Sequence, residues 1–231
     1  AAVLSMTGAG GWPMTVFLTP KLEPFYGGTY FPPEDLYGRP GFKTVLRGVA
    51  AAWRDRRGEV LQSAGRLTAH IEEITAGPAG AGGKIAPDLF DDVAGRLRAT
   101  FDSDEGGWGG APKFPSSGAV MFLLRRHRRT GDAHTLRMAT FTLEKMANGG
   151  IYDHIGGGFH RYAVDAKWRV PHFEKMLYDN AQLAQAYTEA YQATGNAAFR
   201  RVATETLDYL LRDMRDTAGG FHSAEDADSA G

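Results

Sequence analysis

Residues 149–180 read GGIYDHIGGGFHRYAVDAKWRVPHFEKMLYDN. A run of three glycines lies among histidine, arginine, acidic and aromatic residues that follow one another in near alternation. Linkers of this length are normally polar and plain, whereas a concave polar site needs this mixture of side chains. The stretch therefore predicts a functional loop, and the rest of the chain is expected to be its scaffold.

Helical periodicity flanks this loop on both sides. Apolar residues recur at intervals of three and four, and residues that start or stop helices bound each run. The predicted helix boundaries and turns are Pro87-Asp88, Ser116-Ser117 as a cap, Thr130-Gly131-Asp132, Gly149-Gly150, a helix over 180–194, Thr194-Gly195-Asn196, and Gly219-Gly220. This half of the chain is therefore predicted to be a series of helices.

The helices and loops repeat. Thr-Gly turns occur at 130 and 194, and glycine-aromatic loops read GGWGG at 106–110, GGGFHRY at 156–162 and GGFHSAEDADS at 219–229. Repeats of this kind stack, so that each helical hairpin buries the apolar face of the next. The short turns lie at one end of the hairpins, and the long loops, which carry the reactive side chains, lie at the other. The reactive groups are therefore expected to gather at the loop end. A plain helical array, whose loops only turn corners, is the alternative.

Residues 1–80 have a different pattern. After a loose glycine-rich start, two strand-like runs at 14–20 and 25–31 predict an antiparallel hairpin. From Phe42 to Ile74 apolar residues keep helical spacing, which predicts one long helix or two in line, with a bend at Gly58. The run AGPAGAGG at 76–83 has linker composition. We therefore expect one domain over 1–80 and another over 81–231.

Several motifs resemble one family. GGWPMTVFLTPKLEPFYGGTYFPPED at 10–35 is similar to the C-terminal half of the thioredoxin-like domain in the family of spermatogenesis-associated protein 20. GGWGGAPKFP, the 149–183 stretch and GGFHSAEDADS resemble that family's long motifs, so the resemblance covers nearly the whole chain.

The resemblance implies a fold that is mainly α with a small α/β part. The C-terminal portion of a thioredoxin-like domain would be followed by an incomplete α/α toroid of helical hairpins, similar to six-hairpin glycosidases and N-acylglucosamine 2-epimerases. Pro13 would be the cis-proline of the thioredoxin fold, and the family's cysteine motif would lie upstream of Ala1. An ordinary trans proline at an edge strand is the alternative.

The totals exclude several functions. Twenty-six basic and 27 acidic residues give a net charge of −1, so no basic excess favours nucleic acid. No run is long enough to span a membrane, and the start lacks a signal-peptide pattern, so we expect a cytoplasmic protein. The missing initiator methionine suggests a piece of a longer product. The absence of cysteine excludes a disulfide, a thiol nucleophile and a thiolate zinc site in this chain.

The loops supply the candidate site residues. Paired carboxylates serve glycoside hydrolysis, bind a hard cation through their oxygens, or simply stop a helix and solvate a loop. Histidine suits proton transfer beside a sugar carbonyl, and the alternative is a histidine that bonds backbone near a helix start. The candidate catalytic residues are His160, Arg161, His172, Glu174, Asp179, Glu225 and Asp226. The candidate substrate-binding residues are Trp108, Tyr162, Trp168, Arg169, Phe221 and Asp228. Core packing is the alternative for each aromatic residue. We expect no metal and no cofactor, because His172 and Glu174 lack a third ligand at a recognisable spacing.

These features favour a carbohydrate-directed protein whose glycine-rich loops form the pocket, as a sugar isomerase or epimerase, a hydrolase, or a binder. A small-molecule sugar is then the expected partner, and neither nucleic acid nor membrane is. One alternative is a thiol-redox protein whose cysteines lie upstream. Another is an interaction module without activity.

Overall fold

A computed structural model describes residues 1–231 except 9, 12, 77–87 and 229–231. The chain divides into two compact units, Ala1–Lys84 and Ile85–Gly231. The predicted linker at 76–83 lies outside the described residues, apart from Ala76. The peptide bond before Pro13 involves Trp12, which is also outside them, so the cis-proline stays a prediction. No helix in the described ranges is long and apolar enough to cross a membrane.

The first unit contains the predicted hairpin. Strands β1 (Thr15–Leu18) and β2 (Pro24–Gly28) pair antiparallel, with Thr15 opposite Gly28 and an irregularity between Phe17 and Leu18. Helix α1 (Ala2–Thr7) precedes them and contacts β2. The expectation of a loose start was therefore wrong for residues 2–7, because Val3 anchors this short helix by burying its side chain.

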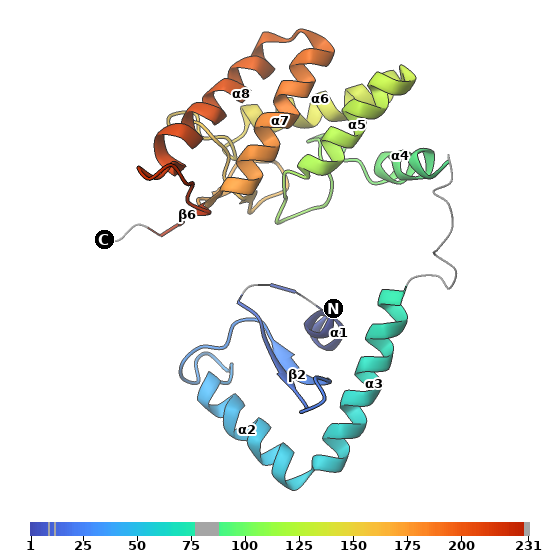
Figure 1. Ribbon diagram of the computed structural model, residues 1–231, viewed down its shortest axis with the longest axis vertical. Helices are drawn as coiled ribbons and strands as arrows, with labels where there is room; N and C mark the ends of the chain where they lie inside the picture. The colour runs from blue at the N-terminus through green and yellow to red at the C-terminus, as the bar shows by residue number, and fades with distance from the viewer. Residues whose placement is uncertain (9, 12, 77–87, 229–231) are drawn as a thin grey trace. The chain divides into compact units, whose positions relative to one another are not determined.

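The long helical segment is broken earlier and more sharply than the sequence predicts. Helix α2 (Phe42–Asp55) ends at Arg56, whose φ of −133° leaves the helical region, and α3 (Arg57–Ala76) begins at the next residue. Figure 1 shows that the two helices form a V, so they are not in line. Gly58 lies inside α3, and the bend is therefore made by Arg56 rather than by glycine.

The second unit is built of helical hairpins (Figure 1). Its helices are α4 (Leu89–Ala99), α5 (Ser117–Thr130), α6 (Ala133–Asn148), α7 (Leu177–Thr194) and α8 (Ala197–Tyr209), which continues as a π-helical turn, η1 (Leu210–Met214). Helix α5 packs on α6 and on α7, and α7 packs on α8. Two-residue strands lie in the loops: β3 (Tyr162–Ala163), β4 (Pro171–His172), β5 (Lys175–Met176) and β6 (Ala224–Glu225).

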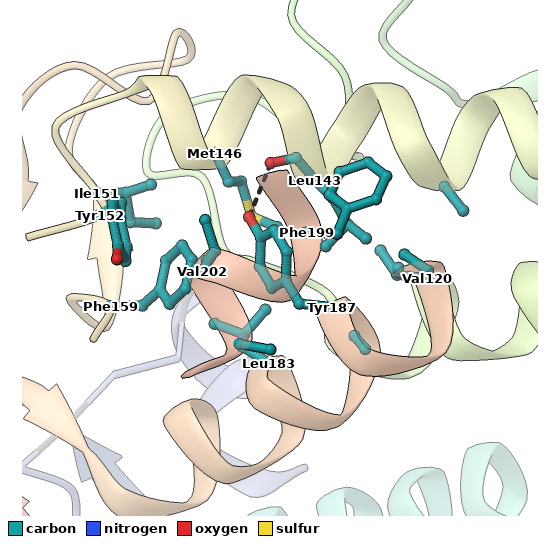
Figure 2. Packing of buried hydrophobic residues seen from close by; sticks show 14 of the residues in the cluster. Val120, Leu143, Met146, Ile151, Tyr152, Phe159, Leu183, Tyr187, Phe199 and Val202 are labelled. Atoms are coloured by element: carbon teal, nitrogen blue, oxygen red, sulfur yellow. Dashed lines mark hydrogen bonds between the residues drawn. The ribbon is translucent and has the colours of Figure 1, made fainter. Parts of the chain in front are cut away.

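Aromatic residues from the loop and the helices form the core of this unit. The ring of Tyr187 on α7 stacks on Phe159 of the long loop at 5.3 Å and faces Phe199 of α8 at 6.0 Å. The Tyr187 hydroxyl donates to the Leu143 carbonyl of α6 at 2.7 Å, which satisfies its one buried polar group (Figure 2). The long loop is thus part of the core, and its position is fixed by that packing.

Side-chain caps explain where two of the helices begin. Asp132 accepts the N–H of His134 at 2.9 Å, and Asn196 accepts that of Ala198 at 3.0 Å, so both Thr-Gly turns cap the following helix as predicted. The helix start predicted at Ser116-Ser117 is confirmed, because α5 begins at Ser117, but Ser116 does not cap the helix through its side chain. This residue has a φ of +50° and makes no side-chain cap bond, while the neighbouring Ser117 hydroxyl donates to Gln182 of α7 at 2.7 Å.

Candidate functional site

Two loops of the helical unit are built in the same way around an aspartate. Asp102 begins one loop and Asp153 begins the other. The N–H of Gly106 donates to the carbonyl of Asp102, and that of Gly157 to the carbonyl of Asp153, each at 2.9 Å. Each carboxylate accepts two more N–H groups within its own turn at 2.9 to 3.0 Å. Each loop is closed by an isolated antiparallel β-bridge between two aromatic residues, Phe101 with Trp108 and Tyr152 with Phe159.

A buried lysine fixes each aspartate. Lys113 Nζ lies 2.6 Å from Asp102 Oδ2, and Lys175 Nζ lies 2.7 Å from Asp153 Oδ2. The Lys113 side chain is fully buried, and that of Lys175 is 7% exposed. Burial alone would raise the pKa of Asp153, but the bond from Lys175 and the turn N–H groups outweigh it and lower that pKa to about 2. The Asp153–Lys175 pair is therefore ionised at neutral pH.

Asn180 holds the long loop against α7. Its side chain is fully buried, and it accepts the N–H of Phe159 at 2.6 Å while donating to the Phe159 carbonyl at 3.0 Å. The adjacent Gly158 has a φ of +79°, and a Cβ there would lie 2.5 Å from Cδ1 of Tyr209. Glycine is needed at this position both for the backbone conformation and for the close approach. Together these contacts set the direction in which the next residue, His160, points.

The loops enclose a hollow of about 560 Å³. The long loop and β5 supply Asp153, His160, Phe173 and Lys175 to its walls, and residues 225–228 supply the rest. The two segments meet because β5 and β6 pair antiparallel, with Lys175 opposite Glu225. This pairing brings four of the sequence candidates to one place, namely His160, Glu225, Asp226 and Asp228.

His160 is the least solvated polar candidate in the hollow. It is 7% exposed, and its Nδ1 is buried with no hydrogen-bond partner among the described residues. The ring of Phe173 meets it edge-on at 5.1 Å. Burial and the nearby charge of Lys175 lower the pKa of His160, against the opposing effects of the Phe173 backbone, Asp153 and Glu225. The imidazole is therefore neutral at pH 7, the form that accepts a proton.

A hydrogen bond from Tyr209 orients the Glu225 carboxylate. Its Oε2 accepts the hydroxyl of Tyr209 at 2.7 Å, and the Tyr209 ring lies 4.3 Å from Lys175 Nζ. Burial and the bond to Glu225 raise the pKa of Tyr209, so its hydroxyl remains a donor at neutral pH. Tyr209 thus links the carboxylate of Glu225 to the Asp153–Lys175 pair.

Three further candidates form a separate group. Arg161 Nη1 lies 2.7 Å from Glu174 Oε2, and the N–H of Arg161 donates to the Glu174 carbonyl at 2.7 Å. Asp179 lies in the first turn of α7. Burial raises its pKa to about 6, with Arg161 opposing the change and Glu174 adding to it. None of the three is among the residues that line the hollow around His160.

His172 and Tyr162 belong to an aromatic stack. Their rings lie 4.7 Å apart and nearly parallel, because β3 pairs with β4. The ring of Phe114 packs against that of Tyr162 at 5.0 Å. His172 Nδ1 is buried without a partner in the part of the chain that the structure describes. Arg169 is exposed beside this stack, and its backbone N–H donates to the Asp165 carboxylate.

The aromatic candidates are distributed differently from one another. Trp168 is fully buried, and its indole N–H donates to the Glu105 carbonyl at 2.8 Å, so it presents no surface to a ligand. Trp108 packs against the core and donates to the Leu97 carbonyl at 2.8 Å. Phe221 is 45% exposed and remains available for a ligand. Within the described ranges, no group of three or more histidine or acidic residues is placed to hold a metal ion.

Sequence reasoning missed Asp153, Phe173 and Lys175 as candidates for the site. A signal for the ion pair was present, since each of the two glycine-aromatic loops has an aspartate six residues before its aromatic residue (Asp102 before Trp108, Asp153 before Phe159) and a lysine further on. The two lysines follow their aspartates at different distances, because Lys113 comes 11 residues after Asp102 and Lys175 comes 22 residues after Asp153. Their equivalence is visible only in the folded chain.

Comparison with known families and structures defines the class of protein. The family model Thioredox_DsbH, described as "Protein of unknown function, DUF255", matches residues 1–72. The solved structure of a sugar epimerase from a ruminal bacterium has a TM-score of 0.53 and 18% identity, and covers 58% of this chain and 37% of its own. Cellobiose 2-epimerase from Spirochaeta thermophila has a TM-score of 0.53 and 21% identity, over 61% of this chain and 38% of its own. The chain thus joins a thioredoxin-like segment to α/α-toroid helical hairpins.

The particular relatives agree with this class. Spermatogenesis-associated protein 20 of Homo sapiens is 45% identical over 98% of this chain, and that of Mus musculus is 44% identical over the same share. The resemblance to the spermatogenesis-associated protein 20 family is therefore confirmed. The chain spans 30% of the length of both relatives.

Proposed function

We propose that the hollow around His160 binds a carbohydrate and that His160 acts as a base in sugar isomerisation or epimerisation. The observation that carries the proposal is a buried, neutral histidine that lines the hollow together with carboxylates and whose Nδ1 has no hydrogen-bond partner among the described residues. The fold supports it, because the helical hairpins resemble those of solved sugar epimerases. Ligands of such folds bind where loops cluster on a rigid scaffold.

The walls of the hollow suit a saccharide. Carboxylates accept hydrogen bonds from sugar hydroxyls, and an aromatic ring packs against the apolar face of a pyranose. Glu225, Asp226 and Phe173 supply both kinds of contact in one hollow. Phe173 is 62% exposed, so a ligand can cover its ring. A volume of about 560 Å³ lies within the range of small-molecule sites.

The chemistry follows from the protonation state of His160. Isomerisation of a reducing sugar needs a base that takes the proton from the carbon beside the carbonyl. Return of the proton by His160 to the neighbouring carbon, while the C2 hydroxyl proton passes to the former carbonyl oxygen, isomerises the sugar. Inversion of the same carbon needs a second acid that donates a proton from the opposite face, while the proton taken by His160 is released to water. No electrons are gained or lost overall. Hydrolysis, the other reaction open to paired carboxylates, would use Glu225 and Asp226 and would not need His160 as a base.

Deuterium exchange tests the proposal directly. The chain is incubated with cellobiose and with mannose in heavy water, and loss of the C2 proton signal is followed by NMR. We expect exchange by the native chain, a rate at least tenfold lower in His160→Gln, and no change in His134→Gln, which alters an exposed histidine at the start of α6. Exchange that persists in His160→Gln would refute its role as the base. Binding without exchange would favour hydrolysis or a binding module.

A second candidate function, thiol-redox activity of a longer parent protein, is favoured by the family model matched at residues 1–72. This chain has no cysteine, so the redox pair would have to lie outside it. The full-length coding sequence and an insulin-reduction assay on its product test this function. A product that has no Cys-x-x-Cys and does not reduce insulin would exclude it.

A further inference from the structure

The hollow around His160 has an uneven charge. Four carboxylates, those of Asp153, Glu225, Asp226 and Asp228, line it with a single lysine, Lys175, an excess of three negative charges. His160 adds no positive charge at neutral pH, because burial lowers its pKa. No arginine is among the lining residues.

The one lysine is already committed. Lys175 Nζ bonds to Asp153 Oδ2 at 2.7 Å and to the Gly157 carbonyl at 3.1 Å, and its side chain is 7% exposed. Its charge therefore neutralises that of Asp153. Glu225 has a neutral partner, the hydroxyl of Tyr209, which leaves its negative charge in place.

Asp226 and Asp228 are exposed. Neither makes a side-chain hydrogen bond or an ion pair with the residues that the structure describes. Both belong to the segment after β6 that forms one wall, so their carboxylates border the space where a ligand would sit. A cation that enters the hollow would meet them without first breaking an existing contact.

His160 is a second and independent sign that a ligand belongs here. It is 7% exposed, it lines the same hollow, and its Nδ1 has no partner among the described residues. A buried polar atom of this kind is normally satisfied by a protein group, a water molecule or a ligand. The excess of carboxylates therefore surrounds a group that is built into the fold and that has bonding capacity left.

We propose that this hollow selects a saccharide with a free ammonium group, an amino sugar, over its neutral counterpart, and rejects saccharides that carry a carboxylate or a phosphate. The inference rests on the proposed carbohydrate site and adds its charge preference. Two exposed carboxylates at about 4 to 6 Å from a ligand cation strengthen binding by about 10- to 30-fold in water before salt screens them. The preference weakens as salt screens it, since the Debye length falls from about 30 Å at 0.01 M to about 10 Å at 0.1 M.

The test measures binding of three disaccharides by isothermal titration calorimetry on the whole chain. They are fully deacetylated chitobiose, neutral N,N′-diacetylchitobiose, and a uronic acid disaccharide of the same linkage. We expect the ammonium form to bind about 10- to 20-fold tighter than the neutral form at about 10 mM salt, with most of this advantage lost at about 0.3 M. The uronic acid is expected to bind weakest of the three.

A double variant, Asp226→Asn with Asp228→Asn, should lower the affinity for the ammonium form much more than the affinity for the neutral form, so that the preference falls. Asp104→Asn, in the equivalent loop of the preceding repeat, should change neither. Equal affinity for the ammonium and neutral forms, or tighter binding of the uronic acid, would overturn the inference and leave the carbohydrate site standing. Absence of binding by all three disaccharides and by cellobiose would overturn the carbohydrate site as well, and the inference with it.

Discussion

Replacing Asp153 by asparagine should destabilise the helical unit in a way that depends on pH. The substitution keeps the shape of the side chain and removes its charge. Lys175 would then keep only the Gly157 carbonyl and the Tyr209 ring, at 3.1 and 4.3 Å. The expected loss comes from two sources, the missing carboxylate and an ammonium that stays buried without a counter-ion.

The pKa of Asp153 gives a magnitude for the first source. A fall from 3.8 to about 2 in the folded chain corresponds to about 2 kcal/mol of stabilisation at pH 7. Because the folded pKa is the lower one, this contribution is present above about pH 4 and is lost as the pH falls through about 2. Breaking a fully buried pair costs about 3–5 kcal/mol. With Asp153 25% exposed, we expect about 2–4 kcal/mol at pH 7.

Urea unfolding followed by circular dichroism measures the difference between the native chain and Asp153→Asn at several pH values. The difference should be about 2–4 kcal/mol at pH 7 and should shrink as the pH falls through about 2, below which Asp153 is protonated in the folded native chain as well. Asp104→Asn changes an exposed residue of the neighbouring loop and should stay within about 0.5 kcal/mol. A loss below about 0.5 kcal/mol, or one that does not depend on pH, would refute the reasoning.

Three further predictions concern single side chains. Gly158→Ala should cost about 2–4 kcal/mol in unfolding free energy, because alanine would have to adopt a positive φ and its Cβ would clash with Tyr209. Gly109 also has a positive φ but has open space around it, so Gly109→Ala should cost only about 1 kcal/mol. Similar losses in the two variants would contradict the clash with Tyr209. By NMR, the pKa of His160 should lie below the ordinary histidine value of 6.5, so protonation of His160 should lower the free energy of unfolding as the pH falls through that folded pKa. A His160 pKa above 6.5 would contradict this. Asp179→Asn should raise the free energy of unfolding at pH 7 by about 1–3 kcal/mol, because the raised folded pKa makes the ionised carboxylate unfavourable in the folded chain. The native chain should lose stability as the pH rises through about 6, and the variant should not. A variant that is less stable than the native chain at pH 7 would contradict this.

Local signals in the sequence predicted much of the architecture. Thr-Gly turns, glycine pairs and apolar periodicity are properties of neighbouring residues, so helices α4 to α8 and the hairpin could be placed from them. The break at Arg56 could not be placed in this way, because the helical spacing of the apolar residues continues across the bend and position 56 itself is neither proline nor glycine. Helix α7 also begins at Leu177, three residues before the predicted start.

The site was predicted as a region and not as an arrangement. Composition identified the loops, but the β5–β6 pairing joins residues about fifty positions apart through strands of two residues, too short for a strand pattern. Without that pairing, His160 and Glu225 cannot be assigned to one hollow, nor Arg161 and Asp179 to another group. Trp168 illustrates the same difficulty, since a buried tryptophan and a sugar-stacking one have the same sequence signal.

The most direct test of the carbohydrate site is a titration of the ¹⁵N-labelled chain with cellobiose, followed by amide chemical shifts. The account predicts saturable shifts at residues 153–160, 173–175 and 224–228, which line or support the hollow. These shifts should be lost in His160→Gln. No saturable shift, or shifts confined to the α5–α7 groove around Arg125 and Glu189, would contradict it.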